Sequence, residues 1–190
     1  MEGQIIPIET QRLTIRPLTL TDLEPLCRIL SDPQVMKHSI RGVCDEPATH
    51  RFILWCQTSY AEQGFGPSAL IDKASGELVG FCGVGMERIA ERDEINLGYR
   101  LAQCYWNRGL ATEAARAVID DAFRHFPVES IVAIIEPDHQ ASLRVAQKAG
   151  LHLDAKTDFH QRTVHLYRLT RQRWLQQNTA SIRPTTPATD

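Results

Sequence analysis

The chain has 190 residues, of which 43% are hydrophobic and 23% charged, and its formal net charge is -2 at pH 7. This composition is that of an ordinary globular protein with enough core for one domain. The small net charge does not indicate general binding to nucleic acids or membranes. No apolar run is long enough to span a bilayer. The five cysteines are scattered without a C-x-x-C pair. We therefore expect a cytoplasmic protein without a disulfide framework or a metal site.

The first half of the chain predicts short strands and helices in turn. Residues 12–16 alternate apolar and polar side chains as in a strand. A helix is expected over residues 23–30 with Asp22 as its cap, followed by a short helix at residues 34–36. A longer helix is expected over residues 51–62, before a Gly-Pro segment that breaks it. Strands follow at residues 68–71 and 77–84, joined by a hairpin turn, and the charged residues 87–93 predict a solvated loop.

Residues 94–101 predict a strand that runs into a turn and then the most regular helix of the chain. Apolar residues recur at three- and four-residue spacing from Ala111 to Phe126, which indicates an amphipathic helix. Gly109 lets the backbone of the turn approach a ligand closely, and Arg108 adds a cation. Because the first N–H groups of a helix lack partners and carry partial positive charge, this turn predicts an anion site.

The remaining third of the chain predicts a buried strand at residues 130–136 and a helix over 140–149 that Gly150 ends. Two strands follow at residues 151–156 and 163–169, and a closing helix at 169–177. Ser, Thr and Pro dominate from residue 178 onward, which predicts a disordered tail. We expect one domain over residues 1–177.

The central turn combines an aromatic pair, a glycine and an Ala-Thr-Glu-Ala run, which are Tyr105, Trp106, Gly109 and residues 111–114. In this it resembles the RimJ/RimL-type branch of the GNAT N-acetyltransferase superfamily. The opening of the chain is similar to that branch as well, through Thr10, Arg12-Leu13, Arg16-Pro17, Asp22 and Asp32-Pro33. One departure is Trp106, which stands where the general superfamily pattern, Gln/Arg-x-x-Gly-x-Gly/Ala, has Gln or Arg. The resemblance covers about residues 10–174.

The resemblance implies the α/β (α+β) GNAT fold, a mixed, mostly antiparallel sheet flanked by helices, with acetyl-CoA as co-substrate. The cofactor would enter where the strand at 94–101 splays from the next one. The pantetheine arm would then pair with the backbone near Tyr99, Arg100 and Leu101. The pyrophosphate would rest on the turn formed by Asn107, Arg108, Gly109, Leu110, Ala111 and Thr112.

The resemblance also places cofactor contacts on the helix at 140–149. Many superfamily members carry a tyrosine there that protonates the thiolate, but the matching position is Ala146. The RimJ/RimL-type branch uses a serine within Asn-x-x-Ser, and Ser142 matches that serine. His139 replaces the asparagine and could make the same hydrogen bond. The alternatives are that Ser142 only satisfies backbone groups and that His139 only caps the helix.

Amine acetylation needs a group that removes a proton, because an alkyl ammonium has a pKa of about 10. Glu94 is the expected general base, directly or through water, since it lies on the strand where the family carries its carboxylate. The aligned position is Asn96, which cannot act as a base but could orient the amine or a water. The strand alternation places Glu94, Asn96 and Gly98 on one face. The alternative is that Glu94 is only an exposed charge at a strand end.

The expected function is acetyl transfer from acetyl-CoA to a primary amine, on a peptide N-terminus or a small molecule, by a monomer or homodimer. By resemblance, residues 35–50 would help form the acceptor pocket, but they contain no recognisable code. A non-catalytic acyl-CoA-binding or sensing module is the rival, and it predicts binding without amine-dependent CoA release. A general binder of phosphate ligands would bind nucleotides that lack the pantetheine arm equally well.

Overall fold

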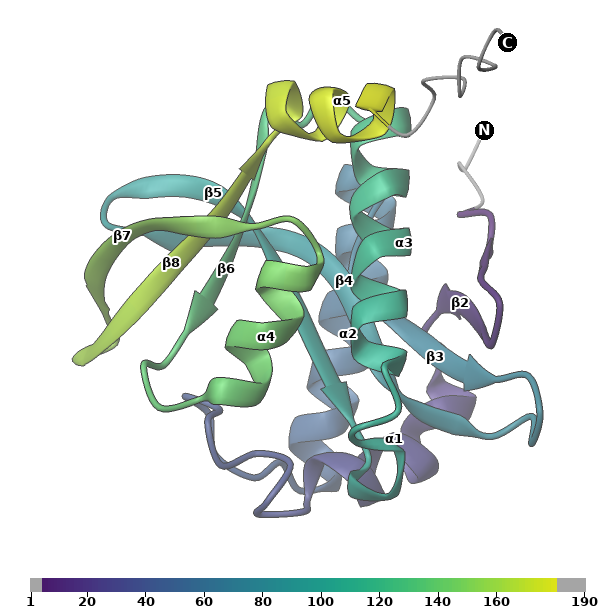
Figure 1. Ribbon diagram of the computed structural model, residues 1–190. Coiled ribbons are helices and arrows are strands. Elements are labelled where there is room, and N and C mark those ends of the chain that lie inside the picture. Colours follow the sequence, from purple (N-terminus) through teal and green to yellow (C-terminus); the bar gives the residue numbers. More distant parts are fainter. Residues whose placement is uncertain (1–4, 181–190) are drawn as a thin grey trace, which may run out of the picture.

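The computed structural model describes residues 5–180 and shows a twisted sheet between two layers of helices (Figure 1). The strands are β1 (Ile8–Glu9), β2 (Leu13–Pro17), β3 (Ser68–Asp72), β4 (Leu78–Ile89), β5 (Arg92–Leu101), β6 (Ser130–Ile135), β7 (His152–Phe159) and β8 (Arg162–Thr170). The helices are α1 (Leu23–Leu30), α2 (Glu46–Gln63), α3 (Leu110–His125), α4 (Gln140–Lys148) and α5 (Arg171–Ala180), with short 3-10 turns η1 (Leu20–Asp22) and η2 (Gln103–Tyr105).

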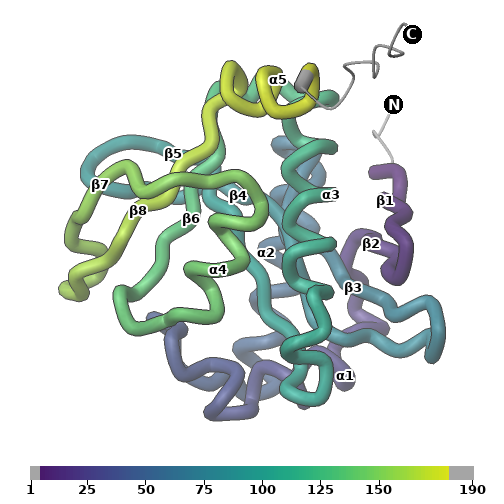
Figure 2. The backbone as a smooth tube through the Cα atoms, in the orientation of Figure 1, coloured from purple at the N-terminus to yellow at the C-terminus, as the bar shows by residue number. Residues whose placement is uncertain are grey.

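The eight strands form one sheet in the order β1-β2-β3-β4-β5-β6-β8-β7. All neighbouring pairs are antiparallel except β5 and β6, which are parallel. The expectation of a mixed, mostly antiparallel sheet is therefore confirmed. The chain trace in Figure 2 places β1 and β7 at opposite edges, with the β5–β6 junction in the middle of the sheet.

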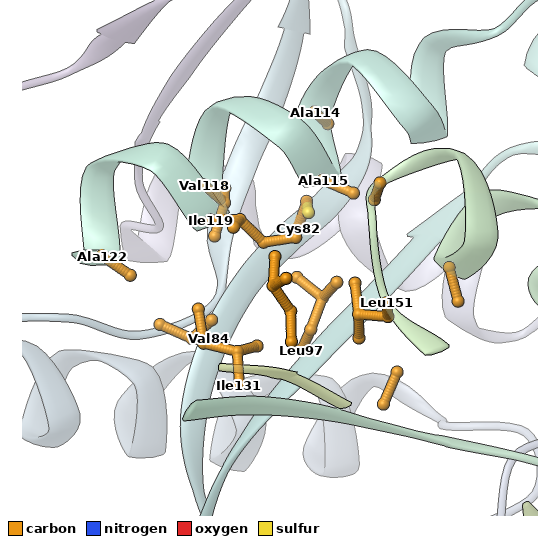
Figure 3. Packing of buried hydrophobic residues seen from close by; sticks show 14 of the residues in the cluster. Cys82, Val84, Leu97, Ala114, Ala115, Val118, Ile119, Ala122, Ile131 and Leu151 are labelled. Atoms are coloured by element: carbon orange, nitrogen blue, oxygen red, sulfur yellow. The ribbon is translucent and has the colours of Figure 1, made fainter. Parts of the chain in front are cut away.

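The main core lies between α3 and one face of the sheet. The three- and four-residue spacing in α3 turns Ala114, Ala115, Val118, Ile119 and Ala122 toward Val84, Leu97 and Ile131, as Figure 3 shows. All of these side chains are at most 5% exposed. A second cluster fills the opposite face under α1 and α2 and includes Leu26, Ile53 and Cys56. Burial of both faces fixes the orientation of β4 and β5, because adjacent side chains on a strand point to opposite faces.

Helix α2 begins at Glu46, five residues before the predicted start. Asp45 caps it by accepting a hydrogen bond from the backbone N–H of Ala48 at 2.8 Å, and Pro47 lies in the first turn. Proline suits that position because its missing N–H would have no helical partner there. The early start brings Ala48 and Arg51 to the wall of a cavity described below.

The prediction of a solvated loop at residues 87–93 is wrong. Strands β4 and β5 continue through this segment as a long hairpin, in which Glu87 is paired with Glu94 and Ile89 with Arg92. Ala90 and Glu91 form the tight turn at φ values of 46° and 66°. Positive φ at both central residues is typical of the turns that match the twist of a hairpin. The charged residues of this segment suggested a loop, because they lie on a strand face that is exposed to solvent.

Three further predictions differ at helix ends. Asp22 does not cap α1: its carboxylate accepts two hydrogen bonds from Arg16, both at 2.8 Å, and one from the Thr19 N–H at 2.9 Å at the start of η1. Residues 34–36 lie in turns instead of a helix. Helix α5 continues to Ala180, beyond the expected domain end at 177, and residues 181–190 of the predicted tail lie outside the described residues. Within residues 5–180, no helix is long and apolar enough to cross a bilayer.

The parallel ladder between β5 and β6 is very short. Only Ile95 pairs with Ile131 and Asn96 with Val132, although β5 continues to Leu101 and β6 to Ile135. Beyond Asn96 the two strands diverge, with α4 in front of the opening (Figure 1). The facing backbone edges therefore do not pair with each other, and such groups need another partner.

Candidate active site

A cavity of about 360 Å³ lies between the end of β5, the turn that starts α3, and α4. It collects nearly all of the predicted cofactor residues: Tyr99, Arg100, Leu101, Asn107, Gly109, Leu110, Ala111, Thr112, His139 and Ser142. Arg108 is the exception, because its guanidinium lies over the ring of Tyr105, 5.2 Å from the centroid, and outside the lining. We call this cavity the cofactor cleft.

One end of the cofactor cleft has the character of an anion site. Gly109 precedes α3 with φ 77° and Asn107 adopts φ 59°, so the turn takes left-handed conformations that favour glycine and asparagine. The N–H of Glu113 makes the first helical bond, to the carbonyl oxygen of Gly109 at 3.0 Å. The three N–H groups before it point to the helix start, where the dipole favours negative charge. Arg144 and Lys148 line the facing side of the cleft.

The turn before α3 is held in place by an ion pair from the beginning of the chain. Glu113 accepts hydrogen bonds from Arg12 Nε, the Arg12 N–H and Thr10 Oγ1, each at 2.7 Å. Arg12 Nη1 also donates to the carbonyl oxygen of Arg108 at 2.8 Å. Burial would raise the pKa of Glu113, but these hydrogen bonds outweigh it and hold the pKa below its ordinary value. Trp106, the departure from the superfamily pattern, donates from Nε1 to the carbonyl oxygen of Leu101 at 2.8 Å and closes the turn.

At the middle of the cleft, Tyr99 on β5 meets Ser142 on α4. Their hydroxyl oxygens are 2.7 Å apart, and Ser142 is 8% exposed. Burial raises the pKa of Tyr99 to about 12, so its hydroxyl keeps a proton at neutral pH. Ala146, which replaces the superfamily tyrosine, is buried in the core. A tyrosine hydroxyl thus reaches the cleft from a different element. The sequence predicted a cofactor contact only for the backbone of Tyr99. The alternation along the strand nevertheless places its side chain on the face opposite Asn96.

Glu94 lies at the paired end of the β5–β6 junction. Its carboxylate forms a two-pronged ion pair with Arg168 on β8, with both N–O distances at 2.9 Å. Arg168 also donates to Ser130 Oγ at 2.7 Å and to Asp154 Oδ2 at 2.8 Å. The Glu94 side chain is only 14% exposed and is absent from the lining of the three cavities described here. Its role as base stays a prediction.

A second cavity of about 620 Å³ lies on the other face of β4 and β5, under α2 and the segment before it. We call it the acceptor cavity. It shares Tyr99 and Arg100 with the cofactor cleft, so the two spaces meet at these residues. Asn96 lines the acceptor cavity, and its buried Oδ1 has no hydrogen-bond partner among the described residues. Glu87 also lines it, opposite Glu94 in the ladder, and sequence reasoning missed this residue by placing it in a loop.

A third, smaller cavity of about 160 Å³ adjoins both and is lined by His38, Glu136 and His139. The rings of His38 and His139 stack at 4.0 Å, and Glu136 binds His38 Nδ1 at 2.7 Å and Arg162 Nη1 at 2.5 Å. Burial, with His38 and Arg100 nearby, lowers the pKa of His139 to about 4, so this ring is neutral at pH 7. Its side chain makes no cap bond to α4, which removes the alternative that His139 only caps the helix.

The described residues contain one group with the geometry of a metal site. His38, Glu136 and Asp138 place ligand atoms within 4.8 Å of one another. Glu136 is already bound by Arg162 and His38, which holds its pKa below the ordinary value against the effect of burial. Glu136 thus joins His38 and Arg162 in one hydrogen-bonded network.

Comparison with known proteins agrees with this geometry. Residues 12–152 match the model of the acetyltransferase (GNAT) domain family. The chain is 36% identical over 146 residues to an uncharacterized protein, YkkB, of Bacillus subtilis, covering 75% of this chain and 83% of that protein. It is 31% identical over 151 residues to an uncharacterized N-acetyltransferase, p20, of Bacillus licheniformis, covering 76% and 84%.

Solved structures show the same fold. An acetyltransferase from Agrobacterium tumefaciens superposes with a TM-score of 0.76 at 25% identity, over 89% of this chain and 96% of that one. RimL, a ribosomal L7/L12 α-N-protein acetyltransferase in complex with coenzyme A, gives 0.68 at 16% identity over 87% and 98%. Aminoglycoside acetyltransferase AAC(6')-Ib with coenzyme A gives 0.72 at 16% identity over 87% and 99%.

A splayed sheet with an anion site at a helix start is the architecture of an acyl-CoA-dependent transferase, and the chain belongs to the GNAT acetyltransferase family. Within that family it falls in the RimJ/RimL-type branch and is an acetyl-CoA-dependent N-acetyltransferase.

Proposed function

We propose that the enzyme transfers the acetyl group of acetyl-CoA directly to a primary amine, without a covalent enzyme intermediate. The observation that carries this is the meeting of the cofactor cleft and the acceptor cavity at Tyr99 and Arg100. A thioester in one space and an amine in the other would touch there. RimL acts on a protein N-terminus and AAC(6')-Ib on aminoglycosides, so both acceptor classes occur on this fold.

The cofactor would lie along the cofactor cleft. Its pyrophosphate would accept hydrogen bonds from the N–H groups of residues 110–112, with Arg144 and Lys148 close by. The pantetheine amides would pair with the open edge of β5 over residues 99–101, since β6 leaves that edge unpaired. The Arg108 guanidinium lies over Tyr105 and does not line the cleft, so Arg108 would contribute its backbone to the turn.

The chemical step forms a bond between the amine nitrogen and the acetyl carbon and breaks the bond from that carbon to sulfur. The proton lost by the amine goes to a carboxylate, directly or through water. Glu87 is suited to act as this general base, because it lines the acceptor cavity and has no ion-pair partner in the described part of the chain. Glu94 remains the sequence-based candidate. Asn96 Oδ1 would accept a hydrogen bond from the amine, which satisfies this buried atom.

The leaving thiolate takes up a proton from the Tyr99–Ser142 pair. Tyr99 holds its proton at neutral pH and can donate through or beside the Ser142 hydroxyl. Neutral His139 offers one ring N–H and one acceptor to the same part of the cleft.

The test is amine-dependent release of CoA thiol from acetyl-CoA, over a panel of peptides with free N-termini, aminoglycosides, polyamines and amino acids. A parallel assay records the thermal shift with acetyl-CoA and with nucleotides that lack the pantetheine arm. We expect stabilisation by acetyl-CoA above that by nucleotides, and turnover with one acceptor class. Stabilisation without turnover on any amine would instead support the non-catalytic binding module.

A further inference from the structure

The acceptor cavity has an uneven distribution of charge. Three arginines line it, Arg41, Arg51 and Arg100, against the single carboxylate of Glu87. Within residues 5–180, none of the three arginines forms an ion pair with a carboxylate. Arg41 and Arg51 are exposed at the rim, whereas Arg100 is partly buried at the floor. The cavity therefore presents a net positive field to whatever enters it.

Arg100 is the most buried of these three cations. Its guanidinium donates one hydrogen bond, from Nη1 to the carbonyl oxygen of Tyr99 at 2.9 Å. Burial lowers its pKa despite the nearby Glu136, and Glu136 is itself bound by Arg162 and His38. A guanidinium has five N–H donors in a planar fork that matches a carboxylate. A partly buried cation without a carboxylate partner carries an uncompensated desolvation free energy. The remaining N–H donors of Arg100 therefore indicate an anionic ligand.

The floor of the cavity leaves room for that ligand between Asn96 and Arg100. Asn96, Gly98 and Arg100 alternate along one face of β5, so their positions follow one another across the cavity floor. Apart from its chain neighbours, no described heavy atom lies within 4 Å of the point where a Gly98 Cβ would be. A ligand lying over Gly98 would have an unpaired acceptor at one end and an unpaired cation at the other.

The walls of the cavity are mostly apolar and partly aromatic. They include Met36, Val43, Phe52, Trp55, Phe81 and Met86. Phe52 lies within 6.0 Å of Trp55 and 5.0 Å of Phe81, measured between ring centroids. A volume of about 620 Å³ is within the range of small-molecule sites. The walls suit an apolar or aromatic substituent on the ligand.

We propose that the acceptor is a small primary amine that also carries a carboxylate, of the kind that hydrophobic amino acids represent, and that Arg100 binds this carboxylate. The carboxylate lies on Arg100, and the amine lies next to it over Gly98, within reach of Asn96 and beside the junction with the cofactor cleft. This inference rests on the proposed acetyl transfer, whose amine would enter the same cavity. It names the acceptor class and a residue that determines specificity.

The test compares matched acceptors that differ only in the anion. Phenylalanine, phenylalaninamide and phenethylamine form one series, with leucine, leucinamide and isoamylamine as a second. For the wild-type enzyme we expect the KM of the amino acid to be roughly tenfold or more below that of its amide, as a hydrogen bond to a charged group predicts. β- and γ-amino acids in the same assay report the spacing between the amine and the carboxylate.

The variant Arg100→Gln should abolish the preference for the carboxylate, and Arg100→Lys should keep part of it. Arg173→Gln, at an exposed position on α5, is the matched control and should leave the preference unchanged. Binding of N-acetylphenylalanine and of its amide, followed by thermal shift, gives a readout that needs no turnover. Arg100→Gln should weaken only the binding of the anionic product.

The outcomes separate this inference from the proposed function. Turnover of amides, amines or peptides with no preference for the carboxylate would overturn the inference and leave the acetyl transfer in place. An Arg100→Gln variant that raises the KM of acetyl-CoA equally with every acceptor would assign Arg100 to the cofactor and also overturn it. No CoA release with any amine would overturn the proposed function itself.

Discussion

The hydroxyl oxygens of Tyr99 and Ser142 lie 2.7 Å apart and join β5 to α4 across the cofactor cleft. Tyr99 also lies within 3.2 Å of the Ser142 carbonyl oxygen, so its ring is fixed by two contacts with one residue. Both contacts link β5 to α4 across the cleft.

If this pair protonates the thiolate, Tyr99→Phe and Ser142→Ala should each lower kcat by roughly 100-fold or more, the scale of general acid catalysis. The KM of acetyl-CoA should change little. The double variant should be little worse than the poorer single one, because residues that act as a unit are not additive. Steady-state kinetics of the four enzymes measures this. Strictly additive losses would assign the two hydroxyls separate roles.

Glu87→Gln and Glu94→Gln form a matched pair that separates the two candidate bases. We expect Glu87→Gln to lower kcat/KM by about 100-fold, with the unfolding free energy unchanged. Glu94→Gln should instead cost about 1–3 kcal/mol of unfolding free energy, because it leaves Arg168 with a neutral partner. Steady-state kinetics and urea denaturation measure the two effects. The reverse pattern would restore Glu94 as the base.

His139 should make the folded state sensitive to mild acid. Its folded pKa of about 4 lies below the ordinary value of 6.5, so the unfolded chain binds this proton more readily. The contribution of His139 to the free energy of unfolding is therefore fully present above pH 6.5 and decreases as the pH falls toward 4. His139→Asn should lose less stability than the wild type over that window, measured as Tm against pH. His152→Asn, at an exposed position, serves as control. Parallel Tm curves for His139→Asn and the wild type would contradict the prediction.

Glu113→Gln should loosen the turn before α3 without touching the reacting groups. The change removes the ion pair to Arg12 but keeps the side-chain shape. We expect the KM of acetyl-CoA to rise roughly 3- to 10-fold with kcat nearly unchanged, since about 1 kcal/mol of loop ordering is lost. Isothermal titration with CoA and steady-state kinetics measure this. A fall in kcat at constant KM would place the effect on chemistry instead.

Much of the cofactor cleft could be predicted because it depends on local pattern. The resemblance to the RimJ/RimL-type branch, which rests on the local sequence of the turn and of the helix at 140–149, named ten residues that line one cavity. Arg108 is the predicted residue that does not line the cavity, since a loop sequence does not say on which side a long side chain lies. Its stacking on Tyr105 is a contact that no spacing rule predicts.

The acceptor cavity was harder to predict because it depends on contacts between distant segments. Glu87 was assigned to a loop because charged residues on an exposed strand face look like a loop. Trp55 and Arg51 reach the cavity only because α2 crosses the far face of β4 and β5. The partner of Glu94 lies 74 positions away on β8, and no local pattern connects the two.

The short ladder between β5 and β6 divides the sheet into two mechanical halves. Arg168 pins the halves together at one end, since it holds Glu94 of β5, Ser130 of β6 and Asp154 of β7 at once. At the other end, the side chains of Tyr99 and Ser142 link β5 to α4. A pantetheine arm between the strands would then act as a ninth strand, completing the sheet and stiffening both halves about the Arg168 pivot. We therefore expect bound acetyl-CoA to stabilise β6, β7, β8 and α4, so that it would act as part of the fold as well as a substrate.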